Sequence, residues 1–139
     1  MQTLLDANAV LRYLLEDIQG QADEVAEIVA HGAEVTIEVL AECVYVLSGV
    51  YEVPRSAIAE SLGLLLDEVA CPRGKVAATA LGLYAGSSFD FVDCVLAAEH
   101  DISSRSVLTF DKKLRRLLKT RRRNRFPSLL TIPLAVMMQ

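Results

Sequence analysis

Apolar and polar positions along the chain follow two different spacings. Short apolar runs are separated by longer segments in which apolar residues recur every three or four positions. The short runs predict strands at Thr3–Leu5, Glu34–Ile37, Glu68–Cys71, Ser106–Phe110 and Ser128–Ile132. The longer segments predict helices that begin near Asn8, Ala22, Val39, Pro54, Lys75, Asp90 and Asp111. Strands that alternate with helices predict an α/β fold with a mostly parallel central sheet of four or five strands.

Length and composition fit a single domain over residues 1–139. Hydrophobic residues make up 53% of the chain and charged residues 23%, which excludes a disordered or low-complexity protein. The longest uncharged stretch inside the chain, Val76 to Phe89, is too short for a membrane span. Asp6 interrupts any secretory signal, so we expect a cytoplasmic protein. The three cysteines lack CxxC spacing, and we expect them to be buried thiols.

The net charge of −4 conceals an uneven distribution. Nine positive charges and no acidic residue fall within the fourteen residues 112–125, so the rest of the chain carries −13. This density favours contact with nucleic-acid phosphates over a merely solvated helix face. Leu114, Leu117 and Leu118 indicate that part of this helix packs on the protein. The candidate nucleic-acid-binding residues are Lys112, Lys113, Arg115, Arg116, Arg121, Arg122 and Arg123.

Four acidic residues, Asp6, Glu42, Asp93 and Asp111, lie beside predicted strand ends or early in predicted helices. Ligands of open α/β sheets bind at the carboxyl ends of the strands. Each acid also has a simpler explanation, because Asp6 and Asp111 fit helix caps, and Glu42 and Asp93 fit solvent-facing positions. Asp90, one turn before Asp93, fits a cap as well. Clustered carboxylates repel one another, and a hard cation such as Mg²⁺ or Mn²⁺ removes that repulsion.

Four segments of the chain, in order, carry a family resemblance. LLDANAVLRYLL, AECVYVL, FDFVDCVLAAEH and VLTFDKKL resemble the PIN-domain family, and especially the VapC-type toxins of bacterial toxin–antitoxin pairs. The resemblance implies a three-layer α/β/α sandwich with a Mg²⁺- or Mn²⁺-dependent ribonuclease site. By position it implies that Asp6, Glu42, Asp93 and Asp111 are the catalytic, metal-holding acids. Asn8, Asp90 and Thr109 then lie near the site as accessory residues.

These observations lead to the hypothesis that the chain hydrolyses RNA. A water molecule activated by the cation would attack the phosphorus in line with the leaving oxygen. The resemblance also implies a homodimer and a small antitoxin protein that covers the acidic cleft. Two alternatives stay open: a catalytically inactive PIN-like module that binds RNA or protein, and a phosphatase in which Asp6 accepts the phosphoryl group.

Overall fold

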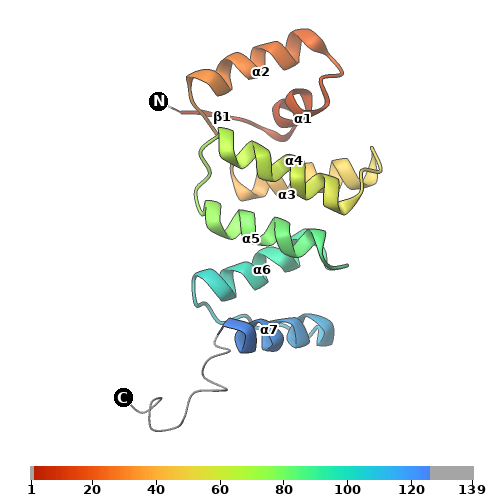
Figure 1. Ribbon diagram of the computed structural model, residues 1–139, viewed down its shortest axis with the longest axis vertical. Helices are drawn as coiled ribbons and strands as arrows, with labels where there is room; N and C mark the ends of the chain where they lie inside the picture. The colour runs from red at the N-terminus through yellow and green to blue at the C-terminus, as the bar shows by residue number, and fades with distance from the viewer. Residues whose placement is uncertain (1, 126–139) are drawn as a thin grey trace. The chain divides into compact units, whose positions relative to one another are not determined.

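The computed structural model describes residues 2–125, with only the backbone of residues 122–125 (Figure 1). The chain divides into two compact units, Met1–Val95 and Leu96–Gln139. The expectation of a single domain over residues 1–139 stays a prediction. The strand expected at Ser128–Ile132 lies outside the described residues.

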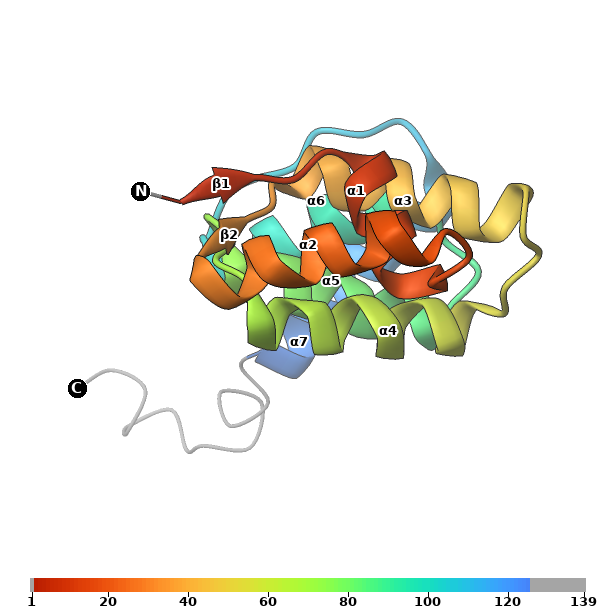
Figure 2. The ribbon, with the colours of Figure 1, turned by 90° about the horizontal axis from the view of Figure 1, so that it is seen from above.

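The first unit contains a small parallel sheet. Strand β1, Thr3–Leu4, pairs with β2, Ala33–Glu34, so that Thr3 lies beside Ala33 (Figure 2). An isolated parallel bridge adds Ala70 on the other side of Glu34, where the Ala70 amide donates to the Ala33 carbonyl oxygen at 2.9 Å. The first three predicted strands are therefore present in shortened form. The second ends early because Thr36 caps the following helix instead of continuing the strand.

The strand predicted at Ser106–Phe110, in the second unit, is not formed. The side chains of Leu108 and Phe110 are 84% and 83% exposed. Alternation of β-favouring residues makes an extended segment, but a strand also requires ladder hydrogen bonds to a neighbour. Residues 2–125 therefore contain two paired strands and one bridge, and not the expected sheet of four or five strands.

Helices make up most of the described chain, and all seven predicted helices are present. In the first unit they are α1 (Ala7–Leu15), α2 (Gln19–His31), α3 (Ile37–Gly49), α4 (Arg55–Glu68) and α5 (Gly74–Ala85). Helix α6 (Phe91–Ile102) runs across the boundary, and α7 (Lys112–Arg125) belongs to the second unit. None of the helices in the described part is long and apolar enough to cross a membrane.

Helix ends follow from local chemistry. Helix α2 ends at His31 and is capped by Gly32, whose φ of 119° strains any residue with a Cβ atom. Pro54, predicted as the first helical residue, is the N-cap of α4. Helix α1 ends at Leu15, and its C-cap Glu16 adopts the left-handed conformation. Helix α2 begins at Gln19, three residues before the predicted Ala22, and therefore includes Gly20.

Packing of the first unit buries the apolar faces of its helices. Helix α1 packs on α2 and α3, α3 packs on α4, and α4 packs on α5. Leu40, Cys43, Ile58 and Leu62 are completely buried. This core fixes the directions in which the exposed faces of α1 and α3 present their polar residues.

Candidate active site

Asp6 is the residue that joins β1 to α1. The Leu5 amide donates to the Glu34 carbonyl oxygen at 2.9 Å and so ties the end of β1 to β2. Asp6 then adopts an extended conformation, and its Oδ1 accepts a hydrogen bond from the Ala9 amide at 2.8 Å. The carboxylate is thus a helix N-cap, and it is exposed to solvent. Capping uses Oδ1 and fixes the orientation of the whole carboxylate group.

Glu42 lies on the exposed face of α3, next to the buried Cys43. The Cys43 Sγ is 3.9 Å from the carbonyl oxygen of Ala7, the first residue of α1. Burial, together with the negative charges of Glu42 and Asp6, raises the pKa of the Cys43 thiol to about 12. Because Cys43 contacts Ala7, the residues that precede them, Glu42 and Asp6, lie in one neighbourhood.

Asp90 and Asp93 lie at the start of α6. Asp90 is exposed, and its carbonyl oxygen accepts from the Cys94 amide at 3.1 Å; Asp93 is half-buried in the first turn. Burial raises the pKa of the Cys94 thiol, and the charges of Asp93 and Asp90 act in the same direction, against a hydrogen bond with Ser87 and the charge of Arg55. These two carboxylates thus share the environment of Cys94.

Arg55 is a residue of this region that the sequence analysis missed. It lies in the first turn of α4, where the helix dipole disfavours a cation. Its Nε donates to the Tyr84 carbonyl oxygen at 2.8 Å, and Nη2 donates to the carbonyl oxygen of Phe89. Arg55 therefore fixes the segment that leads into Asp90. An arginine at an unfavourable helix position is the one sequence signal that pointed to such a role.

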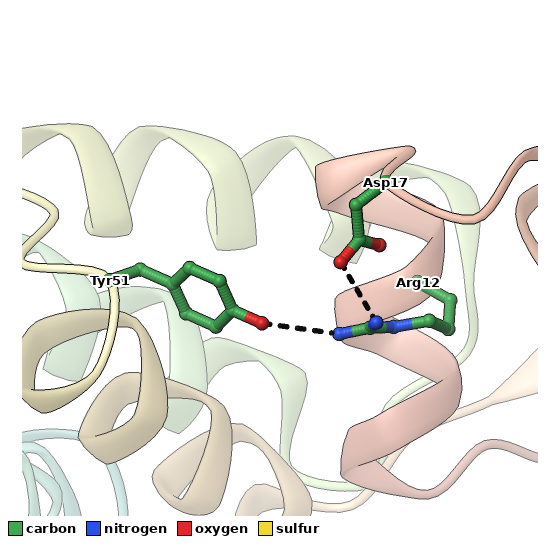
Figure 3. A network of polar contacts seen from close by, with 3 residues as sticks. All are labelled: Arg12, Asp17 and Tyr51. Atoms are coloured by element: carbon green, nitrogen blue, oxygen red, sulfur yellow. Dashed lines mark hydrogen bonds and ion pairs between the residues drawn. The ribbon is translucent and has the colours of Figure 1, made fainter.

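A cleft lies between α1 and α2 on the side of Asp6. Its volume is about 220 Å³, and its lining includes Asn8, Arg12 and Glu24. The Arg12 Nη1 is 2.9 Å from Oδ2 of Asp17, and Nη2 donates to the Tyr51 hydroxyl at 3.4 Å (Figure 3). These contacts hold the guanidinium at the edge of the cleft. Asn8, predicted as an accessory residue, therefore lies beside Asp6 in this cleft.

Asp111 belongs to the second unit, where it caps α7. Its Oδ1 accepts a hydrogen bond from the Leu114 amide at 2.9 Å. Thr109 Oγ1 accepts from the Asp111 amide at 3.1 Å, and the Thr109 carbonyl oxygen accepts from Arg115 Nε at 2.6 Å. The predicted cap is present, and Thr109 and Asp111 form one local hydrogen-bonded turn.

The basic residues of α7 differ in their surroundings. Lys112, Lys113, Arg115 and Arg116 are exposed, as an RNA contact requires. Arg121 instead forms an ion pair with the largely buried carboxylate of Asp101. This pairing offsets its charge within the protein. Arg122 and Arg123 lie in α7, but their side chains are outside the described part of the structure.

Within residues 2–125 the structure shows no group of three or more histidine, cysteine, aspartate or glutamate side chains arranged to hold a metal ion. The predicted acids of the first unit occur as two pairs, Asp6 with Glu42 and Asp90 with Asp93. Exposed carboxylate oxygens are the donors that Mg²⁺ and Mn²⁺ prefer, so the chemistry of the Asp6–Glu42 pair suits such a cation.

The sequence profile of the PIN domain matches residues 3–119, and the chain therefore belongs to the PIN domain family. PIN domains have an α/β fold and are typically nucleases with RNA-related functions that usually use divalent metals, although some are inactive. Comparisons with curated proteins and with solved structures gave no match. The family thus gives nuclease activity as the general expectation for this chain.

Proposed function

We propose that this protein is a Mg²⁺- or Mn²⁺-dependent endoribonuclease and the toxin of a type II toxin–antitoxin pair. The observation that carries the proposal is the contact between Cys43, which follows Glu42, and the carbonyl oxygen of Ala7, which follows Asp6 after the end of β1. In α/β proteins, ligands collect at the carboxyl ends of the strands. Membership of the PIN family supports a nucleic-acid phosphodiester as the ligand.

Asp6 and Glu42 would hold the cation, with Asp93 as a further acid of the same unit. A bound divalent cation supplies an activated water molecule and offsets negative charge on the phosphate. The cap bond from the Ala9 amide fixes the Asp6 carboxylate before substrate arrives, and Arg55 fixes the segment before Asp93. This preorganisation lowers the cost of positioning the reacting groups. Asp111, in the second unit, stays a predicted catalytic acid.

The basic residues of α7 supply a second part of the proposal. Lys112 and Arg116 are exposed one helical turn apart, and exposed cations at such spacing bind phosphates without reading bases. We propose RNA as the substrate, a small antitoxin protein as the inhibitor that covers the acids, and a homodimer as the assembly.

A catalytically inactive PIN-like module that binds RNA or protein is the second candidate. The observation that favours it is that the described residues contain no group of three metal-binding side chains. This module would bind RNA or protein through α7, and replacement of Asp6 or Asp93 would leave that binding unchanged.

A cleavage assay distinguishes the two. Purified protein is incubated with circular single-stranded RNA and with DNA of the same sequence, in Mg²⁺, in Mn²⁺ and in EDTA. We expect metal-dependent opening of the RNA circle, which only an endonuclease produces. Glu42→Gln and Asp93→Asn should abolish cleavage, whereas Glu38→Gln, one turn earlier on the exposed face of α3, should keep it. Metal-independent cleavage, or equal activity of all variants, would reject the proposed site.

The toxin role has its own test. Induced expression of the wild-type chain in bacteria should arrest growth, and expression of Asp93→Asn should not. If bacteria keep growing while they express the wild-type chain, and the purified protein cleaves RNA, the protein is a ribonuclease but not a toxin.

A further inference from the structure

The cleft between α1 and α2 is a mixed polar and apolar site beside Asp6. Ala9 and Val25 contribute apolar wall, and the polar lining comes from Asp6, Asn8, Arg12, Gln21 and Glu24. At about 220 Å³ it is smaller than the roughly 300–1,000 Å³ of pockets that enclose drug-sized ligands. Its size suits one flat ring system, and apolar walls with a few polar groups are typical of sites that orient such a ring.

The charges of the residues that line the cleft limit the kind of ligand that it can bind. Asp6 and Glu24 each bring a negative charge to the lining, whereas the positive charge of Arg12 is shared with Asp17. The cleft is therefore net acidic, and it repels a phosphate group. It favours a neutral group with several hydrogen-bond donors, because ionised carboxylates only accept hydrogen bonds.

We propose that this cleft binds a guanine base of the RNA, next to the phosphate that is cleaved, and that Glu24 selects the base. The proposal rests on the proposed ribonuclease function, because Asp6 belongs both to the cleft and to the candidate active site. Guanine presents two adjacent donors on its Watson–Crick edge, N1–H and the N2 amino group, which match the two oxygens of one carboxylate. Adenine, cytosine and uracil each place an acceptor beside their donor, so a carboxylate pairs with only one of their groups.

The adjacent amides extend this recognition. Asn8 and Gln21 line the cleft from α1 and α2, and a side-chain amide offers both a donor and an acceptor for the remaining base edge. The hydrogen bond from the Ala9 amide to Asp6 fixes the position of this candidate catalytic carboxylate relative to Ala9, a residue of the cleft wall. A base seated here therefore places its own nucleotide beside Asp6.

Binding of single nucleotides tests the cleft without any cleavage. Guanosine, adenosine, cytidine and uridine 5′-monophosphates are titrated separately into ¹⁵N-labelled protein without divalent metal, and the amide resonances of Ala9, Gln21 and Val25 are followed. We expect the guanosine nucleotide to bind about tenfold more tightly than each of the others. Glu24→Gln should remove that preference. Glu27→Gln, an exposed carboxylate outside the cleft on the same helix, should preserve it.

Several outcomes would overturn the inference. Equal affinity for the four nucleotides, or an unchanged preference in Glu24→Gln, would show that the cleft does not read guanine. Stronger shifts with arginine amide than with any nucleotide would show that it takes a basic protein side chain. If the protein prefers guanine but cleaves no RNA, the proposed ribonuclease function is rejected and the guanine site is kept. If it cleaves RNA without base preference at this position, the guanine site is rejected and the ribonuclease function is kept.

Discussion

Arg55 donates a hydrogen bond to the carbonyl oxygen of Tyr84, and its guanidinium carbon lies 3.7 Å from the centre of the Tyr84 ring. One side chain thus combines a hydrogen bond to the backbone with a cation–π contact. The Tyr84 ring also contacts Phe91, the first residue of α6, edge-on at 6.1 Å between ring centres. Arg55 and Tyr84 together connect the start of α4 to the start of α6.

Replacement of Arg55 by lysine should destabilise this connection. Lysine keeps the charge but lacks the planar group that donates to two carbonyl oxygens and stacks on a ring. We expect the free energy of unfolding, from urea titration, to fall by about 2 kcal/mol. RNA cleavage should also fall, because the segment before Asp93 loses its anchor. Arg116→Lys, at an exposed position, is the matched control and should leave the unfolding free energy within about 0.5 kcal/mol of wild type.

Substitutions of Asp6 should distinguish its role as the N-cap of α1 from its proposed role in catalysis. Asp6→Asn keeps an N-cap of equal quality, so the unfolding free energy should stay nearly unchanged while cleavage is lost. Asp6→Ala removes both roles, so cleavage should be lost and the unfolding free energy should fall by about 1 kcal/mol. Thr36→Ala removes the cap bond of α3 to the Val39 amide, 3.2 Å long, and should cost a similar amount but keep cleavage. Cleavage by Asp6→Asn at the wild-type rate would leave Asp6 as a cap only.

The part of this architecture that sequence predicts is the part that local chemistry decides. The strand-to-helix turn at Asp6 and the cap at Asp111 follow from residue preferences and are confirmed. The strand expected at Ser106–Phe110 is wrong, because strand formation depends on a pairing partner that no local pattern specifies. Arg55 acts on residues about thirty positions away, and such contacts are set by helix packing.

The same distinction applies to the candidate site. The spacing of Asp6 and Glu42 along the chain indicates nothing about their separation in space. Their common action on Cys43 results from the packing of α1 on α3. The pairing of Arg121 with Asp101 was equally hidden, because a run of basic residues shows charge but not which member turns toward an internal acid.

The buried Cys43 thiol should make stability decrease in alkaline solution. Its pKa is about 12 in the folded chain, against an ordinary value of 9.0. Between these values the unfolded chain loses the proton and the folded chain keeps it, so the unfolded state binds fewer protons and the unfolding free energy falls as pH rises. The contribution is fully present below pH 9.0 and decreases by at most about 1.4 kcal/mol per pH unit above it.

Cys43→Ala provides the comparison, because it removes the titrating group. We expect the difference in unfolding free energy between wild type and Cys43→Ala to be constant from pH 7 to pH 8.5 and to shrink by pH 10.5. Cys71→Ala, at a half-buried position, should give a smaller change with pH. A difference that does not depend on pH would show that the Cys43 thiol has an ordinary pKa in the folded protein.

The exposed face of α7 should determine how RNA binding depends on salt. Lys112 and Arg116 are both exposed and lie one helical turn apart, whereas the charge of Arg121 is offset by Asp101. Binding is measured by fluorescence anisotropy with a labelled single-stranded RNA in EDTA, from 50 to 200 mM salt. Each phosphate contact to single-stranded RNA contributes about 0.7 to the slope of log K against log salt. The double variant Lys112→Gln, Arg116→Gln should therefore reduce the slope by about 1.4 and leave the unfolding free energy nearly unchanged.

Arg121→Gln is the contrasting variant. Its slope should equal that of wild type, because the guanidinium is already paired with Asp101. Its unfolding free energy should fall by about 2 kcal/mol, because the largely buried Asp101 carboxylate loses its arginine partner, while His100 stays nearby. An unchanged slope in the double variant would exclude this face of α7 from the RNA interface. A reduced slope in a fully stable Arg121→Gln protein would show instead that Arg121 leaves Asp101 to contact a phosphate.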